Sequence, residues 1–499
     1  MRPKTTAVRS LSFQIAVALT AACSATTIQA AEIAAGLQAE AQRTGSVDTL
    51  IVLRAEAPKQ LLRTDGDYLA RRRALVELLR ATADASQSDV RAWLEAEGVS
   101  YRPFWIVNMI EARLTAAQMN VLAARGDINR IASNQSFALQ RPVEDTGLLP
   151  RPQSPEAIEW GVNKIKAPQV WALGINGSGV VVAGQDTGIR WTHGAIKAKY
   201  RGWDGLVADH NYNWHDSIHA TGSTCGADSA QPCDDNGHGS HTVGTMVGDD
   251  GAGNQVGVAP GARFIGCRNM NAGNGTPATY NECAQWLLAP TNLAGLNPDP
   301  DKAPDVVSNS WGCPTSEGCV SGSEVGPAIE NLIAGGIMFV AAAGNSGSSC
   351  STITDAPGKY DNVFTIGSTT SADAISSFSG RGPVAGATRN KPDVVAPGSS
   401  VRSINNASDA GYMTISGTSM ATPHVAGAAA LLMQVNPALK GNPTAVADLL
   451  RSTAVPIVNA QVCGAIPGTT FPNPVQGYGQ IDVLAAVIKA DTLFADRFQ

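Results

Sequence analysis

Three short glycine-rich blocks carry an aspartate, a histidine and a serine in that order along the chain. They are Gln185-Asp186-Thr187-Gly188, Asn236-Gly237-His238-Gly239-Ser240-His241 and Ser416-Gly417-Thr418-Ser419-Met420-Ala421-Thr422-Pro423-His424. A serine hydroxyl is a weak nucleophile at neutral pH, so it needs an imidazole to take its proton and a carboxylate to hold that imidazole in the correct tautomer. The three residue types therefore predict nucleophilic catalysis by Ser419, with His238 as the base and Asp186 as the group that orients it.

Each block also has a simpler interpretation. An isolated Asp-Thr-Gly is more often an ordinary turn, because Asp and Gly suit turns for backbone reasons. His238 and His241 lie about one helical turn apart, which could suggest a metal pair. A zinc protease, however, would carry Glu directly after the first histidine, and this chain has Gly239 there.

Taken together, the blocks resemble the three active-site signatures of the subtilisin family of serine proteases (peptidase S8), in that family's order. DTG after a strand, NGHGSHTVGT and SGTSMATPHVAG carry the resemblance, which runs from Glu159 to Leu484. Near its start, the segment Glu159-Trp160-Gly161-Val162-Asn163 looks most like relatives of bacillopeptidase F. The resemblance implies an endopeptidase that cleaves proteins or peptides through an acyl-enzyme, and it implies no cofactor for the chemistry.

A helix is expected to begin at Ser419, since Pro423 suits a first turn and the small apolar residues that follow suit tight packing. The free N–H groups of a helix start favour a developing negative charge. By resemblance, the Ser419 N–H is one oxyanion donor and the side chain of Asn345 is the other. The simpler interpretation of Asn345 is a turn former.

The resemblance also implies residues that contact the substrate. Ser310-Trp311-Gly312 would act as an edge strand that pairs with the substrate backbone, and Ala343 and Gly344 would lie beside it. Trp311 stands where relatives often have a smaller apolar residue. The floor of the pocket for the residue before the cut falls near Asp355, where a buried carboxylate would favour Lys or Arg.

Two segments raise the question of metal binding. The loop from Gly248 to Val256 has the length that often holds calcium in relatives, but the expected Asn ligand position falls on Gly251. Asp249, Asp250 and Asn254 still offer oxygens, so a structural calcium ion stays an open alternative. For the loose cluster of His210, His215 and His219, a place on a loop surface is favoured over a metal site.

A scaffold must hold these residues, and short β-branched runs followed by glycine-rich turns and helix-like segments predict it. The clearest runs are Val180–Ala183, Phe264–Gly266, Val306–Ser308, Met338–Ala341 and Val363–Ile366. Continuous apolar strands are buried on both faces, which indicates a parallel sheet covered by helices, with its site at the carboxyl ends of the strands. We therefore predict an α/β fold over residues 159–490, resembling the three-layer subtilisin-like domain with a mostly parallel sheet. Residues 491–499 form a short tail.

Residues 48–140 predict a smaller α+β unit. Thr49–Leu53, Phe104–Leu114 and Ile128–Ser133 are strand-like, and Asp67–Leu94 and Ala116–Ala124 are helical, an alternation that fits a ferredoxin-like fold. In this unit the run Arg71-Arg72-Arg73 is interpreted as a solvated helix face rather than a processing site. The proline-rich residues 141–158 predict an exposed linker with a maturation site.

The resemblance implies a role for this small unit. It would be the propeptide, which templates folding, occupies the active-site cleft as an intramolecular inhibitor and is removed by autoprocessing. The alternatives are a separate binding module, or an inhibitor that acts in trans. A catalytically inactive binding protein on the same fold would have lost at least one signature residue, and none is lost.

Composition and the chain start predict the location. The net charge of -6 and the 16% of charged residues describe an ordinary globular enzyme without a basic surplus for nucleic acid, and a monomer is expected. Basic residues precede a short apolar run from Leu11 to Ala22, so residues 1–31 predict a secretory signal peptide; a lipid anchor at Cys23 is the less favoured alternative. Of the nine cysteines only Cys23 lies in this segment. The even remainder suggests disulfides, and three pairs are close in sequence: Cys225–Cys233, Cys267–Cys283 and Cys313–Cys319.

Overall fold

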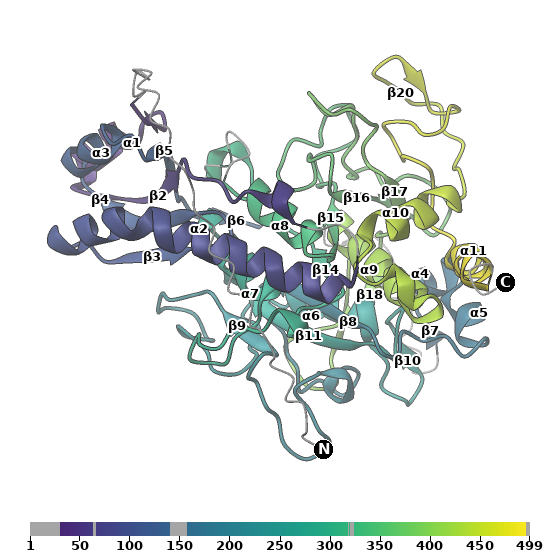
Figure 1. Cartoon of the computed structure of the whole chain (residues 1–499). Helices are drawn as coiled ribbons and strands as arrows, with labels where there is room; N and C mark the ends of the chain where they lie inside the picture. The colour runs from purple at the N-terminus through teal and green to yellow at the C-terminus, as the bar shows by residue number, and fades with distance from the viewer. Residues whose placement is uncertain (1–29, 63–65, 140–156, 318, 320–323, 496–499) are drawn as a thin grey trace, which may run out of the picture.

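The computed structural model of the chain describes residues 30–62, 66–139, 157–317, 319 and 324–495. The predicted signal peptide, except for its last two residues, and nearly all of the predicted linker lie outside these ranges. The described residues form two packed parts, the N-terminal unit (residues 30–139) and the main domain (residues 157–495) (Figure 1). Among these residues, no helix has both the length and the apolar character that a membrane span requires.

The N-terminal unit has the ferredoxin-like order that the sequence predicted. Its five-stranded sheet has the order β1-β5-β2-β4-β3, and all neighbours except the parallel pair β1 and β5 are antiparallel. Helix α2 connects β2 to β3, and α3 connects β4 to β5, which gives the βαββαβ unit. The elements are β1 (Glu32–Ile33), α1 (Leu37–Thr44), β2 (Val47–Leu53), α2 (Tyr68–Ala96), β3 (Tyr101–Phe104), β4 (Met109–Leu114), α3 (Ala116–Ala123) and β5 (Ile128–Ser133).

Two details of this unit differ from the prediction. The unit begins before residue 48, because β1 and α1 belong to its sheet and core; a two-residue strand and a helix with few apolar residues leave little pattern to detect. The predicted strand from Phe104 to Leu114 is two strands, β3 and β4. The turn between them ends at Asn108, which adopts a positive φ of 47°.

The main domain contains a seven-stranded parallel sheet. Its order is β17-β16-β15-β14-β8-β11-β9, and each predicted run overlaps one of its strands. The sequence did not predict the short strand β9 or the edge strand β17. The strands are β8 (Val181–Asp186), β9 (Trp214–Asp216), β11 (Arg263–Arg268), β14 (Val306–Asn309), β15 (Met338–Ala342), β16 (Phe364–Thr369) and β17 (Val394–Pro397).

Alternate residues of these strands belong to two cores on opposite faces of the sheet, which gives the predicted three layers. Val182 and Val306 pack in one core with α6 (His238–Val247) and α9 (Thr418–Val435). Ala183 and Val307 pack in the other with α7 (Pro277–Leu288) and α8 (Gly326–Ala334). Because both faces are covered, the strands are apolar without alternation.

The remaining elements lie outside these three layers of sheet and helices. Helix α11 continues through Ala495, so the predicted start of a tail at residue 491 is wrong. The other elements are η1 (Lys59–Leu61), β6 (Phe137–Ala138), β7 (Ala157–Ile158), α4 (Trp160–Lys164), α5 (Ala167–Trp171), η2 (Lys197–Lys199), β10 (Asn254–Gln255), β12 (Met270–Asn271), β13 (Asn274–Gly275), η3 (Pro300–Lys302), η4 (Thr315–Glu317), β18 (Val401–Ile404), β19 (Tyr412–Ile415), η5 (Pro437–Leu439), α10 (Pro443–Ser452), β20 (Val462–Cys463), β21 (Ile466–Pro467) and α11 (Val483–Ala495).

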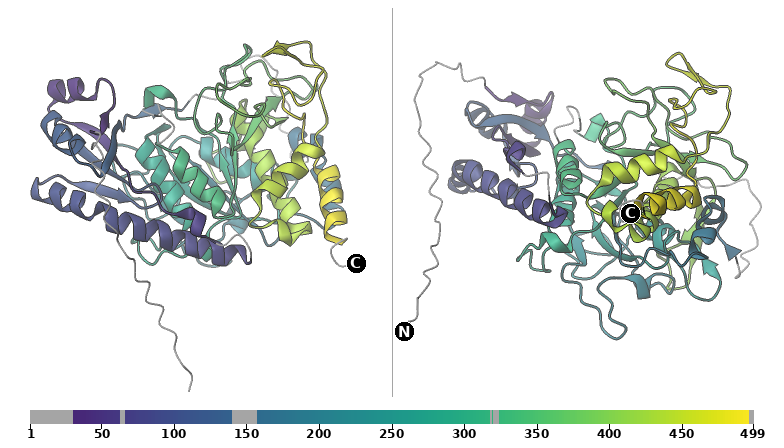
Figure 2. Two further views of the ribbon diagram at one scale, coloured as in Figure 1. Left: turned by 45° about the horizontal axis from the view of Figure 1, so that its top comes forward. Right: turned by 45° about the vertical axis from the view of Figure 1, so that its right-hand side comes forward.

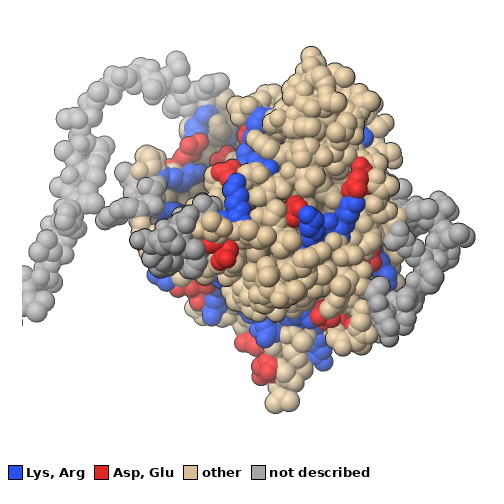
Figure 3. Space-filling model, turned by 90° about the vertical axis from the view of Figure 1, so that its right-hand side faces the viewer, with Lys and Arg blue, Asp and Glu red and all other residues tan. Residues whose placement is uncertain are grey.

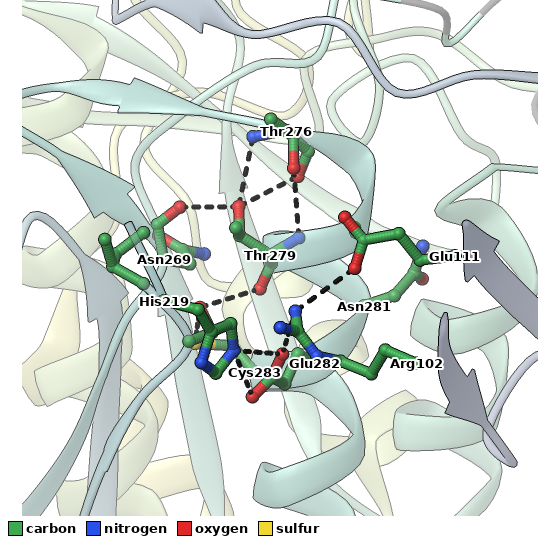
Figure 4. Close-up of polar contacts among 12 residues, drawn as sticks. Arg102, Glu111, His219, Asn269, Thr276, Thr279, Asn281, Glu282 and Cys283 are labelled. Carbon is green, nitrogen blue, oxygen red and sulfur yellow. Dashed lines mark hydrogen bonds and ion pairs between the residues drawn. The ribbon is translucent and has the colours of Figure 1, made fainter. Parts of the chain in front are cut away.

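The N-terminal unit contacts the helix α7 of the main domain through a network of charged groups. Arg102 of β3 lies between two carboxylates, Glu111 of β4 and Glu282 of α7, at 3.1 Å from each (Figure 4). His215 and His219 of the main domain donate to the same Glu282 carboxylate at 2.9 and 3.0 Å. Burial alone would raise the pKa of Glu282, but the two histidine hydrogen bonds lower it. Glu282 therefore stays ionised as the acceptor for Arg102.

Further contacts between the two parts are also polar and buried. Arg130 of β5 pairs with Glu324, whose side chain has no exposed surface. Arg72 of α2 is only 2% exposed and donates to the main chain of the main domain. The interpretation of Arg71-Arg72-Arg73 as a solvated helix face is therefore wrong for Arg72, because the first half of α2 lies on the main domain (Figures 1 and 2).

Surface charge is mixed where it can be seen. On the face shown in Figure 3, acidic and basic side chains lie interspersed among other residues, without a broad area of one sign. This agrees with the small net charge of the sequence.

Four cysteine pairs lie at disulfide distance. Three are the pairs expected from sequence, Cys225–Cys233, Cys267–Cys283 and Cys313–Cys319. The fourth joins Cys350 to Cys463 across a sequence separation of 113 residues and ties the β20–β21 hairpin to the segment that follows Asn345.

The loop lengths predict how much each bridge contributes to stability. We expect Cys350→Ser with Cys463→Ser to lower the free energy of unfolding by about 5 kcal/mol, and Cys313→Ser with Cys319→Ser by about 2 kcal/mol, because closing a longer loop restricts the unfolded chain more. Guanidinium unfolding of both double variants in a Ser419→Ala background, which prevents self-digestion, measures this. Equal losses, or a larger loss for the short loop, would contradict the expectation.

Candidate active site

Asp186 and His238 meet at the carboxyl edge of the sheet. Asp186 is the last residue of β8, His238 is the first of α6, and the imidazole Nδ1 lies 2.7 Å from Asp186 Oδ1. Both residues are buried, with 3% and 2% of their surface exposed. Burial alone would lower the pKa of His238, but the charge and hydrogen bond of Asp186, together with Asp234, raise it. Asp186 therefore makes His238 a stronger base, and the other ring nitrogen of His238, Nε2, faces away from the carboxylate.

Ser419 is the second residue of α9 and is bonded to Ser310. Its Oγ donates to the Ser310 carbonyl at 2.9 Å, and Ser310 Oγ donates back to the Ser419 carbonyl at 3.0 Å. The Ser419 carbonyl is open to this bond because Pro423, four residues later, has no N–H to complete the helical ladder. Pro423 thus lies inside α9, not in its first turn as expected from sequence.

The structure therefore joins two of the three predicted residues directly. Within the described residues His238 Nε2 is buried without a hydrogen-bond partner, and Ser419 Oγ points to Ser310 instead. For proton transfer from Ser419 to His238, the serine side chain must turn from Ser310 toward Nε2.

Asn345 is fixed beside Ser419 by the residue that precedes the serine. Its Oδ1 accepts hydrogen bonds from both the N–H and the Oγ1 of Thr418, each at 2.9 Å. These two bonds decide which end of the amide is the oxygen and which is the NH2 group, a donor. Such an arrangement positions a side-chain donor next to a helix N-terminus, where negative charge is favoured.

A cavity of about 320 Å³ brings the predicted substrate-binding residues together. Three residues of the N-terminal unit, Phe137, Ala138 and Leu139, line the same cavity. The predicted residues in its wall are Ser310, Trp311, Gly312, Ala343, Gly344, Asn345, Asp355 and Ser419.

The strand β6 leads into this cavity, and the sequence did not predict that it would pair with the main domain there. Ser310-Trp311-Gly312 follows β14 as unpaired chain in the wall of the cavity, and its pairing with a substrate backbone stays a prediction. The strand β6 pairs antiparallel with β13, and the Leu139 N–H donates to the Gly273 carbonyl at 2.7 Å. A recognisable signal was present, because Ala272-Gly273 forms a two-residue loop between β12 and β13 with φ of 49° and 86°, as in type I′ hairpins.

Trp311 is largely a core residue. Its ring stacks on Tyr280 with a centroid distance of 3.8 Å, and its Nε1 donates to the Gln185 carbonyl at 3.0 Å. Only 4% of its surface is exposed. The large side chain therefore braces the wall of the cavity from behind.

Asp234 was not singled out from sequence, yet it organises the start of α6. Its Oδ1 accepts from Thr187 Oγ1 at 2.9 Å and from the Gly237 N–H at 2.8 Å, and its Oδ2 accepts from the N–H and Oγ of Ser240. One carboxylate thus links the residue after Asp186 to the helix that begins with His238. An acidic residue just before a helix start was the available signal.

The candidate metal ligands do not gather around a common point. His241 Nε2 bonds to the Val401 carbonyl at 3.0 Å, and burial lowers the pKa of His241 to about 3. His210 bonds to Tyr200, whereas His215 and His219 bind Glu282. The loop-surface prediction is confirmed for His219, which is an exposed loop residue, and is wrong for His215, which lies half-buried in β9. Within the described ranges no group of three or more His, Cys, Asp or Glu side chains is arranged for a metal ion.

The predicted calcium loop binds its own polar groups. Asp249 Oδ1 accepts a hydrogen bond from the Gly251 N–H at 2.9 Å. Asp250 accepts hydrogen bonds from the Ala252 N–H, from the main-chain N–H of Asn254 and from the side-chain amide of Asn254. Asp250 Oδ2 also accepts from the Tyr412 hydroxyl, and Asn254 Oδ1 accepts from Arg402, so most of the candidate ligand oxygens are already hydrogen-bonded. In this conformation the residues do not fit a calcium site.

Comparisons with known proteins give a consistent result. A sequence model described as the Subtilase family matches residues 177–479. Bacillopeptidase F of Bacillus subtilis (strain 168) is 34% identical over 430 residues, which cover 82% of this chain and 28% of that protein. Subtilisin DY of Bacillus licheniformis is 34% identical over 301 residues, covering 60% of this chain and 92% of that protein. The chain thus spans less than a third of the length of bacillopeptidase F, and the likeness to it extends beyond residues 177–479.

The contacts of Asp234 lead to a prediction about the base. Replacing Asp234 by Asn removes a negative charge that raises the pKa of His238, so we expect the pKa of His238 to fall. NMR titration of the imidazole protons would measure this, with Asp209→Asn, an exposed aspartate, as the control. An unchanged or higher pKa of His238 would show that Asp234 does not act on the base.

Proposed function

The chain belongs to the subtilase family of serine peptidases, and from this membership and the geometry of its site we propose that it is a secreted endopeptidase, made as a precursor, that hydrolyses peptide bonds in proteins. The observation that carries the proposal is the buried Asp186–His238 pair at the sheet edge where Ser419 and Asn345 line one cavity.

In the proposed mechanism Ser419 Oγ attacks the carbonyl carbon of the substrate while His238 Nε2 takes its proton. Asp186 keeps the Nδ1 proton in place and stabilises the imidazolium. The negative oxygen of the tetrahedral intermediate accepts hydrogen bonds from the Ser419 N–H and the Asn345 amide. His238 then gives its proton to the leaving amine. In the second half of the reaction a water molecule attacks the acyl carbon while His238 takes its proton, and His238 returns that proton to Ser419 Oγ as the acyl bond breaks and the acid product leaves.

The N-terminal unit is proposed to be an inhibitory propeptide. In support, β6 extends the β12–β13 hairpin as a substrate strand would, and Phe137, Ala138 and Leu139 line the same cavity as Ser419. Main-chain pairing of this kind binds an extended segment with little regard to its sequence, which suits an enzyme that acts on many proteins. Autoprocessing in residues 141–158 would separate the two parts.

The proposal also states that the enzyme is secreted and that its chemistry needs no cofactor. The predicted signal peptide and the four cysteine pairs suit an oxidising, extracellular compartment. The proposed chemistry uses only side chains and main-chain N–H groups of this chain, and the proposed enzyme acts as a monomer.

Replacing Ser419 tests the whole proposal. We expect the wild type to lose the N-terminal unit, seen by intact mass spectrometry, and to digest casein, whereas Ser419→Ala stays full length with activity lower by about 10⁶-fold. Ser377→Ala, an exposed serine, is the matched control and should behave as the wild type. Equal processing and activity in wild type and Ser419→Ala would remove Ser419 from the mechanism.

Asp355 provides a test of specificity. Because its carboxylate lines the cavity beside Gly312, we expect faster cleavage after Arg and Lys than after Leu or Phe. Asp355→Asn should lower kcat/KM for the Arg substrate by about 10- to 100-fold, the contribution of a hydrogen bond to a charged group, and leave the Leu substrate unchanged. A panel of peptides that differ only in the residue before the cut measures this, and equal rates after Arg, Leu and Phe in the wild type would disprove it.

A further inference from the structure

The helix α2 serves two different cores. Val90 and Leu94 in its second half pack inside the N-terminal unit. Leu75, Val76 and Leu79 in its first half instead belong to the core that α7 and α8 form with the sheet of the main domain. The first half of α2 is therefore held by the main domain rather than by the unit to which it belongs, as its course in Figures 1 and 2 also shows.

Arg72 is the centre of this contact. Its Nε donates to the Gly335 carbonyl at 2.7 Å and its Nη1 donates to the Pro300 carbonyl at 3.2 Å. Gly335 is the C-cap residue of α8, so its carbonyl lies at the negative end of a helix dipole. A guanidinium group cannot lose its charge in a protein, and at 2% exposure it depends on such acceptors.

The two neighbouring arginines reach other points of the main domain. Arg71 Nη2 donates to the Gly441 carbonyl at 2.8 Å. Arg73 binds the Asp301 carboxylate with two parallel hydrogen bonds of 2.7 and 2.5 Å. Three consecutive side chains of one helix thus bind three separate segments of the main domain, which fixes both the position and the rotation of the helix.

Tyr68, the first residue of α2, fits closely against the main domain. The Arg72 guanidinium lies 5.5 Å from the centre of its ring. Gly441 adopts a φ of +75°, and a Cβ atom added there would lie 2.3 Å from Tyr68 Cβ, so only glycine permits this approach. The main domain is shaped for the helix at this point.

We propose that the first half of α2, from Tyr68 to Leu79, occupies a helix-binding exosite on the main domain, formed by the carbonyls of Pro300, Gly335 and Gly441 and by Asp301. None of these residues lines the cavity that holds Ser419. The exosite gives the N-terminal unit a hold on the main domain that does not depend on β6, and its partner is an amphipathic helix with consecutive arginines. This deepens the proposed function, since it adds a second point of attachment to the proposed inhibitor.

The test measures attachment without using peptidase activity. The full chain with Ser419→Ala receives a recognition site for an added protease within residues 141–156, and the two parts are then cut apart. Native mass spectrometry and size exclusion follow the half-life of the complex. We expect Arg72→Met to shorten that half-life at least tenfold, and Arg80→Met, an exposed arginine on the same helix, to change it less than twofold.

A second set of variants decides the matter if Arg72→Met does not fold. Arg73→Ala and Asp301→Ala lie on the surface and should each shorten the half-life about threefold, and the double variant should be no worse than either, because the pair acts as one contact. Equal half-lives for Arg72→Met and Arg80→Met, or no effect in the Arg73 and Asp301 variants, would overturn the exosite. Failure of the proposed peptidase activity would instead appear when the activities of the wild type and Ser419→Ala are compared, which is a separate measurement, because every chain in the present experiment carries Ser419→Ala.

Discussion

A carboxylate and an imidazole held 2.7 Å apart in the interior place the strictest demand on this structure. Removing an ionised carboxylate from water is costly unless it is paired and hydrogen-bonded, so Asp186 and His238 must be positioned by rigid elements. The parallel sheet supplies one, because β8 ends at Asp186 with neighbours on both sides. The helix α6 supplies the other, and Asp234 joins the two.

The same constraint explains how the serine is positioned. Ser419 must lie at a helix start to offer its N–H to a negative oxygen, but α9 is buried almost along its full length and crosses the middle of the sheet. A run of alanines from Ala428 to Ala430 makes this close packing feasible. Pro423 leaves the Ser419 carbonyl without a helical partner, and Ser310 at the end of β14 takes that bond. The sheet edge and the helix start are thereby connected at the nucleophile itself.

Residues that lie in active-site motifs could be predicted from the sequence. The environment of a residue could not be predicted where it depends on segments that are distant in the sequence. Asp186, His238 and Asn345 were recognisable because motifs with fixed spacing carry them. Arg72 was taken for a surface residue because three adjacent arginines normally lie in solvent, and only the main domain, more than two hundred residues away, supplies its acceptors. The short strand β9 and the two-residue strand β1 lack the length that a hydrophobic pattern needs.

The chemistry of the contact between the two parts also bears on their proposed separation. Arg102, Arg130 and Arg72 of the N-terminal unit are all matched by carboxylates or carbonyls of the main domain. The contacts of Arg130 and Arg72 are buried and specify one geometry, but the desolvation of the charges offsets much of their attraction. When the parts separate, each of these groups regains water. The apolar contact of Leu75, Val76 and Leu79 with the main domain is lost at the same time, so the polar contacts specify how the two parts fit and the apolar contact favours their staying together.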